Sequence, residues 1–308
     1  MTKKNLFKKI ASVAMAGALT LSMALPVGAA TNDPNLVVEA NTLYSTPITS
    51  GSSVTLGLMP GNAYYQRSGF DTAEDAASSL NVASITVGED KIDTSKITYG
   101  SMETTDYAGN ATYAGTVTVK GKDGAYGPAS LHVVNKKGTG NYAYIDMTVY
   151  LEAPATQNDV ANVTVQAVDV TGEGKMDVTT DDKLAVAAAT KEEANPFKGA
   201  AGSAQSYPTA GDALYSLAKA TDMTFTQKDG YVKSVTDSER TTLKEHTDYS
   251  DWTYYGWNYC VVRNGAKVTD GDIVSASVLE VKDGDQVLWA YGTMDQAADY
   301  FAEVIKGE

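Results

Sequence analysis

Short runs of alternating apolar and polar residues recur between residues 35 and 153, and Gly, Asp and Asn turn residues separate them. Runs such as "SSVTLGLM", "GTVTVKGKDG" and "YAYIDMTVYL" have the two-residue period of strands with one buried face. Their recurrence at roughly ten-residue intervals is typical of a sandwich or barrel. We therefore expect an antiparallel β-sandwich over residues 33–155. One short helix is expected at "DTAEDAASSL", where Thr72 can cap the first turn.

The pattern changes after residue 160, where strand periods and helix periods mix. Two strand-like runs, "VTVQAVDV" and "DKLAVAAAT", are expected to form a hairpin. A helix should begin at Thr209, because Asp212 completes a variant of the capping box before an apolar face. Further strands follow in "GYVKSVTD", "NYCVVRNG" and "DQVLWAYG". A last helix should begin at Thr293, where Gln296 again completes a capping box, and should pack on the body of the protein.

Two strands, one helix and three further strands follow the order of a β-grasp, a mixed sheet crossed by one helix. The seam between this part and the sandwich is expected in "EAPATQNDVA", residues 152–161, where Pro154 and small polar residues interrupt the strands. We thus expect a mostly β protein whose second domain, residues 160–308, is α+β. Its length also favours two domains over one.

Residues 1–30 have the plan of a secretory signal peptide. Lys3, Lys4, Lys8 and Lys9 precede an apolar stretch that ends in the small residues "PVGAA". The apolar stretch is short for a helix that spans a membrane, so we expect cleavage after Ala29 or Ala30. A retained membrane anchor is the alternative. Export from a Gram-positive type of bacterium, and no integral membrane segment after cleavage, are the corresponding expectations.

Acidic residues dominate the charge, with 38 Asp and Glu against 24 Lys and Arg and a formal net charge of −14. Such a chain repels phosphate backbones, so a nucleic acid partner is not expected. The single cysteine, Cys260, excludes an intramolecular disulfide framework.

Four segments, "TAGDALYSLAKA", "GYVKSV", "GWNYCVVRNGAKV" and "VLEVKDGDQVLWAYG", occur in an order that resembles a known family. Residues 163–292 resemble the bacterial transcobalamin-like C-terminal domain, a secreted β-grasp module similar to the C-terminal domain of intrinsic factor and transcobalamin. The resemblance implies the β-grasp fold and the capture of a corrinoid or another small molecule. Those proteins also use a large helical domain to enclose cobalamin, and no such domain is expected here, so capture would be weak or would need a partner.

The stretch "DWTYYGWNYC", residues 251–260, carries five aromatic rings in a chain with 9% aromatic residues. On a strand, Tyr255 and Trp257 would share one face and Tyr254 the other. The helix that begins at Thr209 should cover one of these faces. The remaining rings suit either the core or a ligand surface. The expected ligand-binding residues are Trp252, Tyr254, Tyr255, Trp289 and Tyr291.

Other candidate chemistry is sparse. Asp169, Glu173 and Asp177 stand at positions 1, 5 and 9 of a degenerate calcium loop, but position 12 is Thr180, where a carboxylate is needed. A tight turn between strands is the alternative. His132 and His246, the only histidines, fall in different predicted domains, and no nucleophile elbow or zinc-protease motif accompanies them.

We therefore expect a secreted, non-enzymatic binding or adhesion protein without a bound cofactor, whose partner is an extracellular protein, a glycan or a small molecule. Corrinoid capture together with a partner is the alternative. An extracellular hydrolase that acts through two carboxylates is a third possibility.

Overall fold

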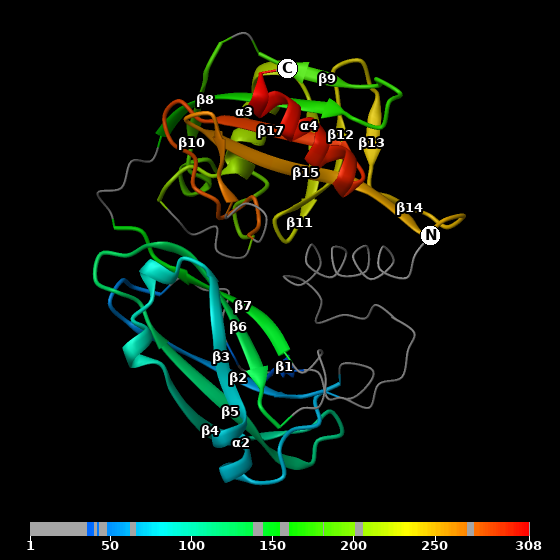
Figure 1. Cartoon of the computed structure of the whole chain (residues 1–308). Helices are drawn as coiled ribbons and strands as arrows, with labels where there is room; N and C mark the ends of the chain where they lie inside the picture. Colours follow the sequence, from blue (N-terminus) through cyan, green and yellow to red (C-terminus); the bar gives the residue numbers. More distant parts are fainter. Residues whose placement is uncertain are drawn as a thin grey trace. The chain divides into compact units, whose positions relative to one another are not determined.

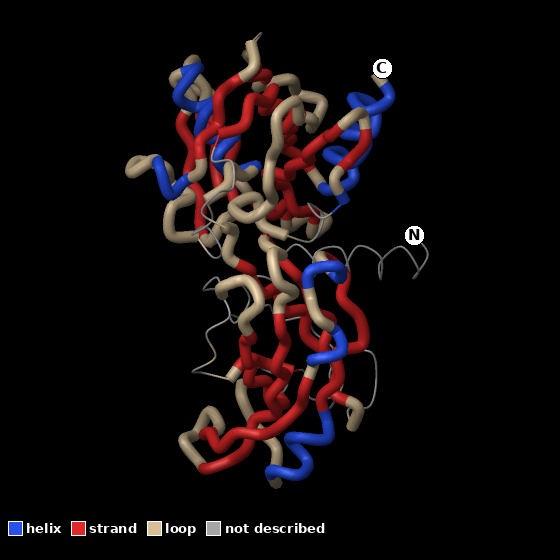
Figure 2. Tube along the Cα trace, turned by 90° about the vertical axis from the view of Figure 1, so that its left-hand side faces the viewer, coloured by secondary structure: helices blue, strands red, loops and turns tan. Residues whose placement is uncertain are grey.

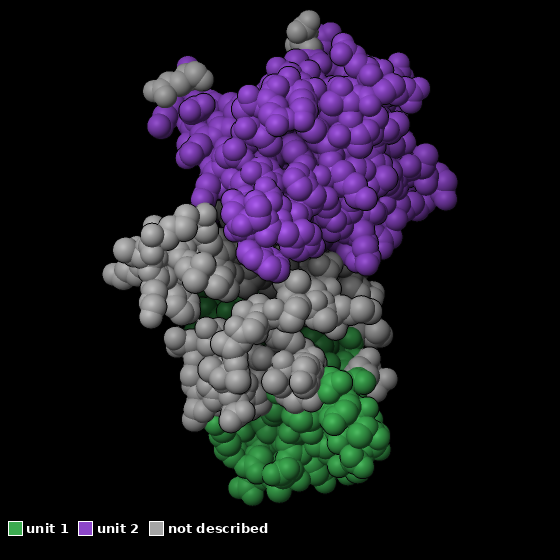
Figure 3. Space-filling model, turned by 90° about the vertical axis from the view of Figure 1, so that its right-hand side faces the viewer, with its two compact units in different colours: residues 1–152 green, residues 153–308 purple. Residues whose placement is uncertain are grey.

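The computed structural model describes most of the chain after residue 35, namely residues 36–39, 42, 48–61, 66–137, 144–154, 160–180, 182–200, 206–269 and 274–307. The expected signal peptide, residues 1–30, lies outside the described residues. The chain divides into two compact units, residues 1–152 and 153–308 (Figure 3). Strands predominate in both units, and the helices are few (Figure 2). The expected mostly β, α+β fold class is confirmed.

The described residues of unit 1 form two antiparallel sheets. The first has the order β1-β2-β5-β4, formed by β1 (Leu36–Val38), β2 (Ser53–Pro60), β5 (Ala111–Lys120) and β4 (Thr98–Thr105). The second has the order β3-β6-β7, formed by β3 (Leu80–Val87), β6 (Gly127–Asn135) and β7 (Tyr144–Leu151). Two short 3-10 turns, Glu89–Lys91 and Thr94–Lys96, lie between β3 and β4.

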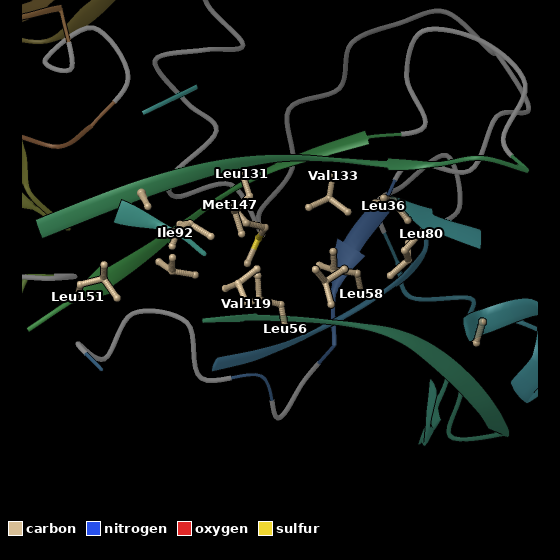
Figure 4. Close-up of a cluster of buried hydrophobic side chains, with 14 of the residues drawn as sticks. Leu36, Leu56, Leu58, Leu80, Ile92, Val119, Leu131, Val133, Met147 and Leu151 are labelled. Atoms are coloured by element: carbon tan, nitrogen blue, oxygen red, sulfur yellow. The ribbon is translucent and has the colours of Figure 1, made fainter. Parts of the chain in front are cut away.

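The core of unit 1 lies between these sheets, as expected for a sandwich. Leu56 and Val119 from the first sheet and Leu131 and Met147 from the second are buried in one cluster. In Figure 4 these side chains point toward one another between the ribbons. The helix α2 (Ala73–Ser79) begins where the sequence predicts, because the Thr72 side chain accepts a hydrogen bond from the backbone N–H of Asp75.

Unit 2 is built on a mixed sheet with the order β10-β8-β17-β15-β14. Its strands are β8 (Val160–Asp169), β10 (Leu184–Ala187), β14 (His246–Asp248), β15 (Thr253–Arg263) and β17 (Gln286–Gly292). The central strands β17 and β8 run parallel, whereas the other pairs are antiparallel. The hairpin of β8 and β10 comes first in the chain, a helix follows it, and the last strand, β17, pairs with β8. This is the order of a β-grasp. Short strands β9 (Asp177–Thr179) and β16 (Ala266–Lys267) pair antiparallel with β8 and β15, respectively.

A second, three-stranded antiparallel sheet of unit 2 has the order β11-β12-β13. It consists of β11 (Thr224–Lys228), β12 (Tyr231–Thr236) and β13 (Thr242–Lys244). Strand β12 contacts β15, so this sheet approaches the aromatic strand. A 3-10 turn, Ala189–Lys191, follows β10.

Helices lie on both faces of the mixed sheet. In Figure 1, α4 (Met294–Lys306) crosses in front of β15 and β17, while α3 (Ala210–Thr221) lies behind and contacts β8 and β10. Both predicted capping boxes are present, at Thr209 with Asp212 and at Thr293 with Gln296. Cys260 and Val262 of β15 pack against Phe301 of α4. The helix α4 therefore covers the Cys260 face of β15, whereas the main contacts of α3, the helix expected to cover one face of this strand, are with β8, β10 and β17.

Candidate functional site

The candidate site is the aromatic hairpin, which we define as residues 246–255: β14, the turn 249–252 and the first residues of β15. The strands pair His246 with Tyr255 and Asp248 with Thr253. The Oδ1 atom of Asp248 accepts the Ser250 N–H at 2.8 Å, and Oδ1 of Asp251 accepts the Thr253 N–H at 3.0 Å. Carboxylate bonds of this kind stabilise tight turns. The hairpin projects from one end of the mixed sheet (Figure 1).

Two rings at the tip of the hairpin are exposed. Tyr249 is 74% exposed and Trp252 is 77% exposed. Their centroids are 5.5 Å apart, and the ring planes are nearly perpendicular, at 85°. Trp252 has a φ of 60°, a left-handed conformation that is uncommon for a residue with a large side chain. The sequence predicted the exposure of Trp252 but missed Tyr249, although an aromatic residue between two aspartates in "DYSD" is the signal that could have found it.

At the base of the hairpin, Tyr254 and Tyr255 lie on opposite faces. Tyr254 is partly exposed, and its hydroxyl donates to Glu245 Oε2 at 2.7 Å, while Lys233 Nζ lies 3.0 Å from the same oxygen. Burial of the phenol, and then the Glu245 hydrogen bond, raise the pKa of Tyr254 above its ordinary value. Tyr255 is half-buried, and its ring stacks on His246 with centroids 4.9 Å apart. These contacts hold the rings of Tyr254 and Tyr255 in place.

Trp289 and Tyr291 lie in the interior instead of beside the exposed rings. They are 2% and 5% exposed, because β17 lies between β8 and β15 and has both faces covered. The Tyr291 hydroxyl donates to the Lys244 carbonyl at 2.8 Å and lies 3.0 Å from His246 Nδ1. Trp289 contacts the Tyr259 ring, with centroids 5.3 Å apart. The prediction of these two residues as surface neighbours of Trp252 therefore needs correction.

The carboxylates of the candidate calcium loop, Asp169, Glu173 and Asp177, already have hydrogen-bond or ion-pair partners within the protein. Oδ1 of Asp169 accepts the N–H and the hydroxyl of Thr171 at 2.9 and 2.6 Å, and Oδ2 accepts the Lys175 N–H at 3.0 Å. Glu173 pairs with Lys175, and Asp177 accepts from Gln166. In the part of the chain that the structure describes, no three His, Cys, Asp or Glu side chains gather in a group suited to a metal ion.

Several buried or partly buried titratable side chains also have structural partners. His132 Nδ1 lies 2.8 Å from Asp146 Oδ1 across β6 and β7 of unit 1, whereas His246 belongs to unit 2. Asp285 is buried and forms a two-pronged ion pair with Arg263 at 2.9 and 2.7 Å. Asp212 accepts from Thr209 and Asn195 at the start of α3. Each of these groups therefore stabilises the structure around it. The aromatic hairpin is the exposed candidate for a functional site.

Comparison with protein-family models, with curated proteins and with solved structures finds no match to this chain. The resemblance to the transcobalamin-like domain therefore stays a prediction. Among the described residues, no helix combines the length and the apolar character that crossing a bilayer requires.

Proposed function

We propose that the protein is an exported, non-enzymatic binding protein that contacts its ligand through the aromatic hairpin. The observation that carries this proposal is the pair of adjacent rings, Tyr249 and Trp252, on a hydrogen-bonded turn at the end of a sheet. Rigid aromatic side chains offer a large contact area at low entropic cost. The signal-peptide pattern of residues 1–30 supports export, and the partners of the histidines and buried carboxylates support a non-enzymatic role.

Trp252 also contributes little to folding. An indole that is 77% exposed gains little from burial, and its left-handed backbone is a conformation that Gly or Asn adopts at a lower cost. A residue that is unfavourable for its turn and exposed to solvent is better explained by binding than by stability. The corrinoid alternative stays an expectation from the resemblance, and no contact in the described residues favours it.

An array of glycans and extracellular proteins tests this function. We expect the mature chain to bind at least one member, and Trp252→Ala to lose that binding while its melting temperature is retained. Tyr107→Ala is the matched control, because Tyr107 is 59% exposed on a turn of unit 1. Binding that survives Trp252→Ala, or that Tyr107→Ala removes equally, would place the binding surface elsewhere.

A further inference from the structure

The two rings at the tip of the aromatic hairpin meet in a T-shaped, edge-to-face contact, which we call the aromatic corner. Tyr249 and Trp252 stand at 85° to each other with centroids 5.5 Å apart, and both are mostly exposed. The face of an aromatic ring carries partial negative charge and attracts cations, with indole the strongest of the three aromatic side chains. The edge of one ring lies against the face of the other, and the ring faces that remain exposed can contact a rounded cationic group.

Negative charge surrounds this corner. Asp248 and Asp251 flank the two rings, and the stretch 245–262 contains no Lys or Arg. The Ser250 hydrogen bonds hold the pKa of Asp248 below its ordinary value, so this carboxylate is ionised at neutral pH. Glu245 is different, because Lys233 neutralises it at the base of the hairpin. The charge at the tip therefore favours a cation and repels anionic ligands.

The chemistry of the tip also selects the kind of cation. A bare metal ion needs several converging oxygen ligands, and the described residues hold no such cluster. A primary ammonium is strongly hydrated through its three N–H groups, and it loses part of this hydration when it lies against ring faces. A quaternary ammonium has no N–H to satisfy, and its methyl groups can lie directly on the two rings.

We propose that the tip of the aromatic hairpin binds a trimethylammonium group of the choline type. Tyr249 and Trp252 would supply the ring faces, and Asp248 and Asp251 would supply long-range negative charge. This inference rests on the proposed function, because it assigns a ligand class to the same hairpin.

Choline titration of the full mature chain, followed by the indole N–H signals in heteronuclear NMR, tests the inference. The chain has three tryptophans, and Trp252→Phe identifies the signal of Trp252 by its loss. We expect choline to shift this signal in a saturable way. The uncharged alcohol in which carbon replaces the choline nitrogen is the matched probe, and we expect it to bind about tenfold more weakly.

Variants separate the rings from the charges. Trp252→Leu and Tyr249→Leu should each abolish or strongly weaken choline binding, while Tyr107→Leu should leave it unchanged. The double change Asp248→Asn and Asp251→Asn should weaken binding severalfold, and added salt should weaken binding to the unaltered chain. Asn keeps the oxygen that accepts the turn N–H, so this pair removes charge while it preserves the turn. Circular dichroism of every variant monitors folding.

The outcomes distinguish the two proposals. Equal binding of choline and its uncharged analogue, or no choline-dependent shift in the unaltered chain, would overturn the cation site without reference to any variant. If the array then still shows a ligand that requires Trp252, the proposed function stands and only the ligand class is wrong. If neither experiment finds binding that requires Trp252, both proposals fail.

Discussion

Trp252 and Trp257 lie close together in the chain, but their surroundings differ. Trp257 is half-buried, its indole N–H donates to the Leu243 carbonyl at 3.1 Å, and its ring contacts Tyr291. Trp257→Ala should lower the free energy of unfolding by about 3 kcal/mol, because it opens a cavity and leaves a carbonyl without its donor. Trp252→Ala should change it by less than about 0.5 kcal/mol. Urea unfolding of both variants measures the difference, and equal losses would contradict it.

Asp212 makes stability depend on pH. It is buried at the start of α3, and desolvation raises its pKa from 3.8 to about 6, against the hydrogen bonds from Thr209 and Asn195. Because the folded-state pKa is raised, the stabilising contribution is complete below the unfolded-state pKa and is lost as the pH rises through about 6.

Asp212→Asn removes this titration and keeps a side-chain acceptor for the Thr209 N–H. We compare the free energy of unfolding of the variant with that of the unaltered chain at each pH. The difference, variant minus unaltered chain, should rise by about 1 kcal/mol between about pH 5 and about pH 8. Denaturant unfolding at both pH values gives the comparison, in which carboxylates common to the two chains cancel. A difference that stays constant with pH would show that Asp212 titrates as an ordinary carboxylate.

At the scale of an element, Thr293 determines where α4 begins. Its side chain accepts the Gln296 N–H at 3.2 Å, and the Gln296 side chain accepts the Thr293 N–H at 2.9 Å. Thr293→Ala should cost about 1 kcal/mol of stability, and Thr293→Ser should restore most of it, because serine caps equally well. Thermal melts of the two variants provide the measurement. An alanine variant as stable as the serine variant would show that packing of Phe301 alone holds the helix.

The elements that the sequence predicted correctly are those with local causes. An N-cap hydrogen bond or a capping box needs only residues three positions apart, so the starts of α2, α3 and α4 could be predicted from Thr72, Thr209 and Thr293. Strand alternation likewise showed which residues of β15 share a face. It could not show which element covers that face, because α3 and α4 are both amphipathic, and only the tertiary fold places α4 on Cys260.

The candidate site was predictable only in part, because it too depends on which elements meet in the tertiary fold. Trp252 lies beside charged and polar residues, which indicated exposure. The burial of Trp289 follows from the central position of β17, and the continuous apolar run "VLWAY" is the local signal of a strand with two covered faces. Tyr249 was missed because the hairpin turn brings it to Trp252, and a sequence pattern does not show which rings meet across a turn.

At the scale of the whole molecule, each compact unit has its own buried core. The core of unit 1 lies between its two sheets, whereas unit 2 buries side chains of its mixed sheet and of α3, among them Val163, Val165, Leu214, Leu217, Val287 and Trp289. The hydrogen bonds that tie Ile48 to Tyr150 and Glu152 stay within unit 1. The strands of the mixed sheet all fall within residues 153–308. A domain with its own core and complete sheets can fold alone.

Residues 153–308, expressed without unit 1, should therefore fold and keep the function that we assign to the aromatic hairpin. We expect a cooperative thermal transition and an indole N–H spectrum that matches the unit 2 signals of the full chain, because all three tryptophans lie in this fragment. Choline should shift the Trp252 signal to the same extent in the fragment and in the full chain, since Asp248, Tyr249 and Asp251 are all retained. A folded fragment that no longer responds, beside a full chain that does, would show that unit 1 contributes to the site.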